Sequence, residues 1–275
     1  MLASRTSGDP PQTKTALALK LGIARSSLYY TPKLPAKDLL LKSQIEAAWE
    51  KHPAYGRERL CLELKVNHKR IQRVMQVCDL HVPRTTKIPK KLADVAQPAA
   101  PYPNLIKSVV PRGIGEIWAG DFTYLPFHGK FLFLSTVMDI YTREILGWNV
   151  LTVHTVALIR GAFLDAKRRA GYLPTYHHSD QGSEYKALSY LREVESLGIQ
   201  VSMSKKGSPW ENGYQESFYG KFKLDLGSIQ DCQTVGEAVA RIHMAIAYYN
   251  NERIHTSLKM PPLRFKERCT QLQLS

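Results

Sequence analysis

The apolar positions in the first 81 residues recur every three or four residues, which is the spacing of amphipathic helices. Residues 13–30 fit a helix, a turn at Gly22 and a second helix, the order of a helix-turn-helix. Further helices are predicted over residues 37–52, 57–65 and 67–79. We therefore expect two small all-α units that carry helix-turn-helix motifs, one over residues 1–36 and one over residues 37–81.

From Glu116 onward, strand-like runs replace this pattern. The predicted strands span residues 118–125, 131–139, 144–150, 176–178 and 199–203. The predicted helices span residues 154–171, 183–197, 208–224 and 234–249. Three antiparallel strands followed by alternating helices and strands indicate an α/β fold, a mixed sheet with helices on both faces. We place this core over residues 115–228 and a helical extension over residues 229–275.

Charge distinguishes the two regions. The formal net charge is +14, and residues 1–110 alone hold 19 basic and 8 acidic side chains, a net charge of +11. Residues 82–114 contain six prolines among basic residues, which predicts an extended basic linker. This asymmetry favours binding of double-stranded DNA by the N-terminal part, the alternative being a solvated basic surface.

The sequence lacks the features of membrane and secreted proteins. No apolar run approaches the about 18 residues of a membrane span, and the first dozen residues lack the apolar centre of a secretory signal. The four cysteines form no CxxC pair, which suits free thiols in a reducing compartment. We expect a soluble intracellular protein.

Three acidic residues resist a purely structural interpretation. Asp121 lies within an apolar strand, where a carboxylate is costly without a cation or donors, and Asp180 directly follows a short strand. Glu211 closes a Ser-x-x-Glu capping box, whereas Glu216 on the same predicted helix has no capping role. The alternatives are a turn or cap for Asp180 and an exposed polar helix face for Glu216. Asp139 is interpreted as a turn former.

Three carboxylates of this kind could together bind a hard divalent cation. At about 100° per residue, Asn212, Glu216, Tyr219 and Lys223 share one helix face. Carboxylate oxygens are the ligands of magnesium, and two ions about 3.5–4 Å apart can promote in-line displacement at phosphorus. The sequence therefore predicts Mg²⁺ or Mn²⁺, two ions in all, held by three carboxylates.

Four motifs make a family resemblance specific. They are WAGDFTYL (118–125), HSDQGSEY (178–185), KKGSPWENGYQESFYGKFK (205–223) and YYNNERIHTSLKMPPLRF (248–265). Thirty-five residues separate Asp180 from Glu216, and Lys223 follows seven residues after the glutamate. Over residues 45–265 the chain resembles the OrfB-type transposases of bacterial insertion sequences, which share the catalytic core of retroviral integrases.

The resemblance implies a ribonuclease H-like fold in which Asp121, Asp180 and Glu216 are the metal ligands and Lys223 contacts DNA. It also implies cleavage at the ends of the element and transfer of the freed 3′-hydroxyl to target DNA, by a homo-oligomer that is at least a dimer. The expected location is the bacterial nucleoid in the cytoplasm. No heptad repeat is present, which leaves open an upstream-frame partner or fusion.

Further DNA contacts are expected from polar residues at helix starts, on basic faces and in loops. These are Arg25, Ser26, Lys69, Arg70, Arg73, Lys205, Lys206 and Asn212. A solvated surface is the alternative for each of them. Two other functions fit the pattern: a hydrolytic ribonuclease H-like nuclease that never joins strands, and a non-catalytic DNA-binding regulator, against which the three acidic residues argue.

Overall fold

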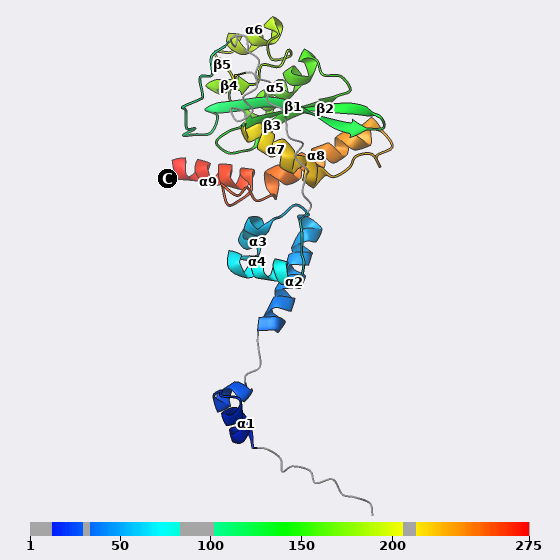
Figure 1. The fold of residues 1–275 in the computed structure, drawn as a ribbon. Helices are drawn as coiled ribbons and strands as arrows, with labels where there is room; N and C mark the ends of the chain where they lie inside the picture. Colours follow the sequence, from blue (N-terminus) through cyan, green and yellow to red (C-terminus); the bar gives the residue numbers. More distant parts are fainter. Residues whose placement is uncertain (1–12, 30–33, 83–101, 206–212, 275) are drawn as a thin grey trace, which may run out of the picture.

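The computed structural model describes residues 13–29, 34–82, 102–205 and 213–274, and its centre is one mixed sheet (Figure 1). The strands are β1 (Ile117–Phe127), β2 (Lys130–Asp139), β3 (Ile145–Leu151), β4 (Tyr176–Ser179) and β5 (Gln200–Met203). They are ordered β3-β2-β1-β4-β5. The first three strands are antiparallel, while β4 runs parallel to β1 and β5 parallel to β4. The predicted mixed α/β sheet is therefore confirmed.

The β1–β2 hairpin forms because its turn residues accept a left-handed backbone. His128 and Gly129 both have positive φ, 44° and 71°, as a two-residue hairpin turn requires. This turn pairs Phe127 with Lys130 and fixes the register along both strands. Alternate side chains of β1 consequently enter two different cores.

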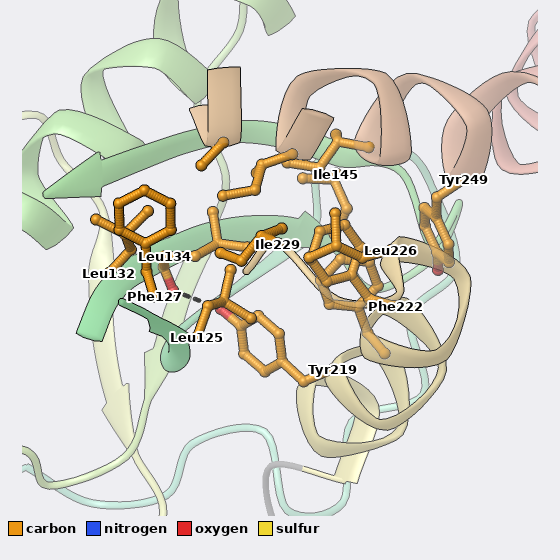
Figure 2. Close-up of a cluster of buried hydrophobic side chains, with 14 of the residues drawn as sticks. Leu125, Phe127, Leu132, Leu134, Ile145, Tyr219, Phe222, Leu226, Ile229 and Tyr249 are labelled. Carbon is orange, nitrogen blue, oxygen red and sulfur yellow. Dashed lines mark hydrogen bonds between the residues drawn. The ribbon is translucent and has the colours of Figure 1, made fainter. Parts of the chain in front are cut away.

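Helices cover both faces of the sheet. The helices α5 (Val156–Ala170) and α6 (Leu188–Ser196) pack on the face that receives Trp118. The helices α7 (Gly213–Leu226) and α8 (Val235–Asn251) pack on the face that receives Leu125 (Figure 2). Gly147 allows α5 to approach closely, since an added Cβ would lie 2.1 Å from the backbone nitrogen of Ala166. The helix predicted over 183–197 begins later than expected, at Leu188.

The second N-terminal unit is a compact bundle of α2 (Leu34–Lys51), α3 (Arg57–Leu64) and α4 (His68–Val77). Its core includes Leu41, Ile45, Leu60, Ile71 and Val74. The Asn67 side chain accepts a hydrogen bond from the Lys69 backbone N–H at 2.9 Å and caps α4 as predicted. Cys78 packs against the same core, and the cysteines are free thiols.

The first unit does not form the predicted pair of helices. The helix α1 (Lys14–Lys20) is followed by a 3₁₀ segment, η1 (Arg25–Tyr29), in place of the expected second helix. The apolar residues Leu21 and Ile23, on either side of the turn at Gly22, are 56% and 42% exposed. Ala18 is the buried residue of α1, so these short segments share too little apolar surface to stabilise each other.

Polar contacts attach the second unit to the core. The ring nitrogen Nδ1 of His52 lies 2.7 Å from the hydroxyl of Tyr248 in α8. The backbone N–H of Ile254 donates to the Tyr55 hydroxyl, and its carbonyl accepts from Arg59 Nε, each at 2.8 Å. Because Ile254 also belongs to the apolar core of the second unit, the segment after α8 joins the two regions.

Part of the predicted linker belongs to the core. Met203 donates its backbone N–H to Pro103 at 3.2 Å, and Leu105 donates to Ser202 Oγ at 2.9 Å. Residues 102–114 therefore pack along β5 and the start of β1, while residues 83–101 lie outside the described residues. The chain ends in α9 (Pro262–Leu274), and none of the described helices has the length and hydropathy to cross a membrane.

Candidate active site

Two of the three candidate carboxylates lie near the end of the parallel pairing of β1 and β4. The last paired residues of the two strands are Ala119 and His178. Asp121 follows two residues later within β1, and Asp180 follows two residues later, directly after the end of β4. Both residues are partly buried. Two acidic residues that are far apart in the sequence thus lie near the same end of this strand pair.

Hydrogen bonds hold the helix α7 against β1, the strand that carries Asp121. Gln215 Nε2 donates to the carbonyl of Ala119 at 2.6 Å, and the Tyr219 hydroxyl donates to the carbonyl of Asp121 at 2.8 Å. The same hydroxyl lies 2.9 Å from Thr136 Oγ1 on β2. Since Gln215 and Tyr219 are one turn apart and buried, they fix the position of α7 on the sheet.

Glu216 lies in the first turn of α7, next to Gln215, and is exposed. The described residues contain no group of three or more His, Cys, Asp or Glu side chains that could hold a metal ion. Among the described residues, the structure therefore does not gather the three candidate carboxylates into one metal-binding cluster. Asn212 lies outside the described residues.

Lys223 follows Glu216 by two helical turns on the same side of α7. Its Nζ lies 4.9 Å from the ring centroid of Tyr124, three residues after Asp121 on β1. Burial of the ammonium group lowers the pKa of Lys223. Lys223 thus lies against Tyr124 of β1, the strand that also carries Asp121.

Burial has the largest effect on the pKa of Asp180 and on that of Tyr219. It raises the pKa of Asp180, although the Gly182 N–H, which donates to Oδ1 at 2.9 Å, acts in the opposite direction. Burial, together with the charge of Asp121, also raises the pKa of Tyr219 well above its usual value. Tyr219 therefore remains protonated and can donate its hydrogen bond at neutral pH.

Sequence reasoning missed Glu184, four residues after Asp180. This buried carboxylate lies 2.7 Å from His154 Nδ1 and accepts from Ser183 Oγ at 2.9 Å. Although burial opposes ionisation, the hydrogen bonds, above all that to His154, lower the pKa of Glu184. It lies within the HSDQGSEY motif, which was the available signal. The adjoining residues His177 and His178 are buried and contact Tyr190 and Ser202 respectively.

The remaining candidate DNA contacts differ in accessibility. Arg73 forms an ion pair with Asp38 at 2.6 Å, and Arg70 donates to the carbonyl of Lys37 at 2.9 Å, so both help to hold α4 against α2. The others among the described residues are exposed: Arg25, Ser26, Lys69 and Lys205. Lys206 lies outside the described residues.

Replacing Tyr219 with Phe should lower the free energy of unfolding by about 1–2 kcal/mol, because it leaves the Asp121 carbonyl and the Thr136 hydroxyl without this buried partner. Urea denaturation measures the effect. Tyr124→Phe is the matched control, since Tyr124 is 57% exposed and its change should stay within about 0.5 kcal/mol. Equal stability of the two variants would show that the Tyr219 hydroxyl does not fasten α7.

Known proteins resemble this chain in both sequence and fold. Residues 111–209 match a family described as "Integrase core domain", and residues 197–262 match a second family with the same description. A transposase for insertion sequence element IS904 of Lactococcus lactis is 31% identical over 228 residues, which is 80% of this chain and 90% of the relative. The putative transposase InsK for element IS150 of Escherichia coli is 28% identical over 262 residues, 89% of this chain and 90% of the relative.

The fold comparison agrees. A chain in the cryo-electron microscopy structure of the simian T-cell lymphotropic virus intasome, in complex with PP2A regulatory subunit B56 gamma, matches with a TM-score of 0.50 and 16% identity. The match covers 77% of this chain and 70% of that chain. The expected ribonuclease H-like, integrase-type fold is therefore confirmed.

Proposed function

The chain belongs to the transposases of insertion sequence elements and is an enzyme of DNA strand transfer, and we propose that Asp121, Asp180 and Glu216 are its catalytic metal ligands. The observation that supports this proposal is the parallel pairing of β1 and β4, whose last paired residues, Ala119 and His178, each stand two residues before a candidate aspartate. Glu216 lies next to Gln215, which binds the same strand through the Ala119 carbonyl.

The donor set fits a hard divalent cation. The three candidate ligands offer carboxylate oxygens, which suit Mg²⁺ or Mn²⁺ rather than zinc. Two such ions, when bound, would favour an attacking hydroxyl and stabilise the oxygen that leaves phosphorus. Tyr219 and Gln215 would keep α7 in place, and Lys223 would meet the DNA backbone beside the site.

The proposed reaction has two displacements at phosphorus. In the first, water attacks the phosphodiester at an end of the element, and the 3′-oxygen of the element leaves as a hydroxyl. In the second, that 3′-hydroxyl attacks a phosphodiester of the target, and a 3′-oxygen of the target leaves. Because each step breaks one phosphorus–oxygen bond and forms another, no covalent enzyme intermediate is required.

The proposed partner is double-stranded DNA, both element ends and target, bound by a homo-oligomer that is at least a dimer. We assign DNA recognition to the units over residues 1–36 and 37–81. Exposed Arg25, Ser26 and Lys69 support this assignment, as does the net charge of +11 over residues 1–110.

A joining assay on labelled element ends tests the proposed reaction. With Mg²⁺ we expect shortened ends and longer joined products, and removal of the metal with EDTA should abolish both while DNA binding persists. Restored activity on adding Mg²⁺ back serves as the control. Shortened ends without joined product would instead identify a hydrolytic nuclease, and DNA binding without either product would identify a regulator.

A further inference from the structure

A second site lies beside α7, away from the three carboxylates. It is a cavity of about 700 Å³ bounded by α3, α7, the start of β1 and the segment that follows α8. Its lining residues with a cationic or imidazole side chain are Arg59, Lys107, Arg143, Lys221, Arg253 and His255. The described residues that line it include no Asp or Glu. Such a one-sided charge predicts an anionic occupant.

Three residues that line this cavity carry buried polar atoms to which no described residue gives a hydrogen bond. Arg143 Nε and Nη1, Arg253 Nη2 and His255 Nδ1 are buried without a hydrogen bond from any described residue. Arg253 is only 1% exposed, and its Nε is already paired with Asp225. Because guanidinium N–H groups only donate, the unpaired arginine nitrogens suit an acceptor such as a phosphate oxygen.

The electrostatics of His255 agree with a cationic cavity. Burial, followed by the positive charges of Arg143, Arg59 and Arg253, lowers the pKa of His255 to about 4. The imidazole is therefore neutral at pH 7, and the arginines supply the positive potential. A phosphate group would offset that potential and accept the unused N–H groups.

The cavity is distinct from the proposed catalytic face of α7. Tyr214, Ser217 and Lys221 line it. At about 100° per residue, these positions lie on the side of the helix opposite Glu216 and Lys223. A ligand here would therefore not replace the metal ligands.

The remaining wall is apolar and aromatic. Ile117, Met138 and Phe218 contribute to it, and the guanidinium of Arg143 lies 3.9 Å from the ring centroid of Tyr214. The volume falls within the range of small-molecule sites. From the combination of unpaired arginine N–H groups with an apolar and aromatic wall, we infer that this cavity binds a nucleotide, its phosphate on Arg143 and Arg253 and its base against that wall. The nucleotide can be free or an unpaired unit of a DNA strand.

Calorimetric titration of the full chain with dAMP in EDTA tests the site. Wild-type protein should bind one dAMP per chain, and deoxyadenosine, which lacks the phosphate, should bind at least about tenfold more weakly. Arg143→Gln and Lys221→Gln should each weaken dAMP binding by at least about tenfold. Arg192→Gln, which removes an exposed charge on α6, should change it by less than about twofold.

Titration with two DNA duplexes distinguishes the sources of the nucleotide. If the occupant is part of a strand, Arg143→Gln should weaken binding of a duplex with one unpaired 5′ nucleotide more than binding of a blunt duplex. If it is a free nucleotide, both duplexes should bind the variant and wild type alike while dAMP binding is lost. Absence of dAMP binding by the wild type, or equal losses in Arg143→Gln and Arg192→Gln, would overturn the inference. Since EDTA excludes the catalytic metals, failure here would leave the proposed function untouched.

Discussion

Asp121→Asn, Asp180→Asn and Glu216→Gln are each expected to lower strand joining by at least about a thousandfold, which corresponds to about 4 kcal/mol of transition-state stabilisation. Each change keeps the size of the side chain and removes the negative charge that a divalent ion needs. Affinity for element-end DNA should remain within about twofold, because phosphate contacts elsewhere supply it. Quantified joined product and fluorescence anisotropy of labelled DNA measure the two effects.

Asp79→Asn is the matched control for these variants. Asp79 is exposed just after α4, and its backbone φ of 50° is one that asparagine tolerates. This variant should join strands at the wild-type rate, which would separate loss of a metal ligand from loss of an acidic charge. Full joining by any of the three carboxylate variants would remove that residue from the active site. Wild-type protein and Asp121→Asn that bind DNA alike and join no strands would favour the non-catalytic regulator.

The hydrophobic pattern identified every strand of the sheet because each is bounded by strong local signals. The turn at His128 and Gly129 and the apolar run of β2 are examples. The sequence pattern places residues 102–114 in the predicted linker. Their place in the core depends on contacts with Ser202 and Met203, almost a hundred positions away, which a local pattern does not show. The second helix expected after Gly22 is replaced by a 3₁₀ segment for a different reason. Helical spacing in the sequence does not by itself provide an apolar surface against which a short helix can pack.

The candidate site shows a similar division. Position alone indicates Asp121 and Asp180: a carboxylate within an apolar strand is costly, and the carboxyl end of a strand is where α/β sheets bind ligands. The sequence does not predict the role of Gln215, because an isolated glutamine on a helix is usually solvent-exposed. Tyr219 was assigned to the polar face of its helix, yet it is buried and bonded to β1. The sequence therefore suggested candidate ligands, while the groups that orient them emerged from tertiary contacts.

Replacing Arg253 with Met should lower the free energy of unfolding by about 3–5 kcal/mol, because it leaves the carboxylate of Asp225 buried without its cation. The side chains of Arg253 and Asp225 are 1% and 4% exposed, and they form an ion pair between the segment after α8 and α7. Burial raises the pKa of Asp225, and the charge of Arg253 opposes that shift. Denaturation in urea, followed by circular dichroism, measures the loss.

Two further variants separate the buried pair from a general effect of charge. Arg241→Met breaks the exposed pair with Asp231 and should cost less than about 1 kcal/mol. The double variant Arg253→Met with Asp225→Leu should recover much of the lost stability, because an apolar pair can replace buried charges once neither is left alone. A double variant no more stable than Arg253→Met would show that Arg253 stabilises the fold through its other contacts. Recovery would mean that an apolar pair can take the place of the buried ion pair, and that the loss in Arg253→Met comes from the charge left alone on Asp225.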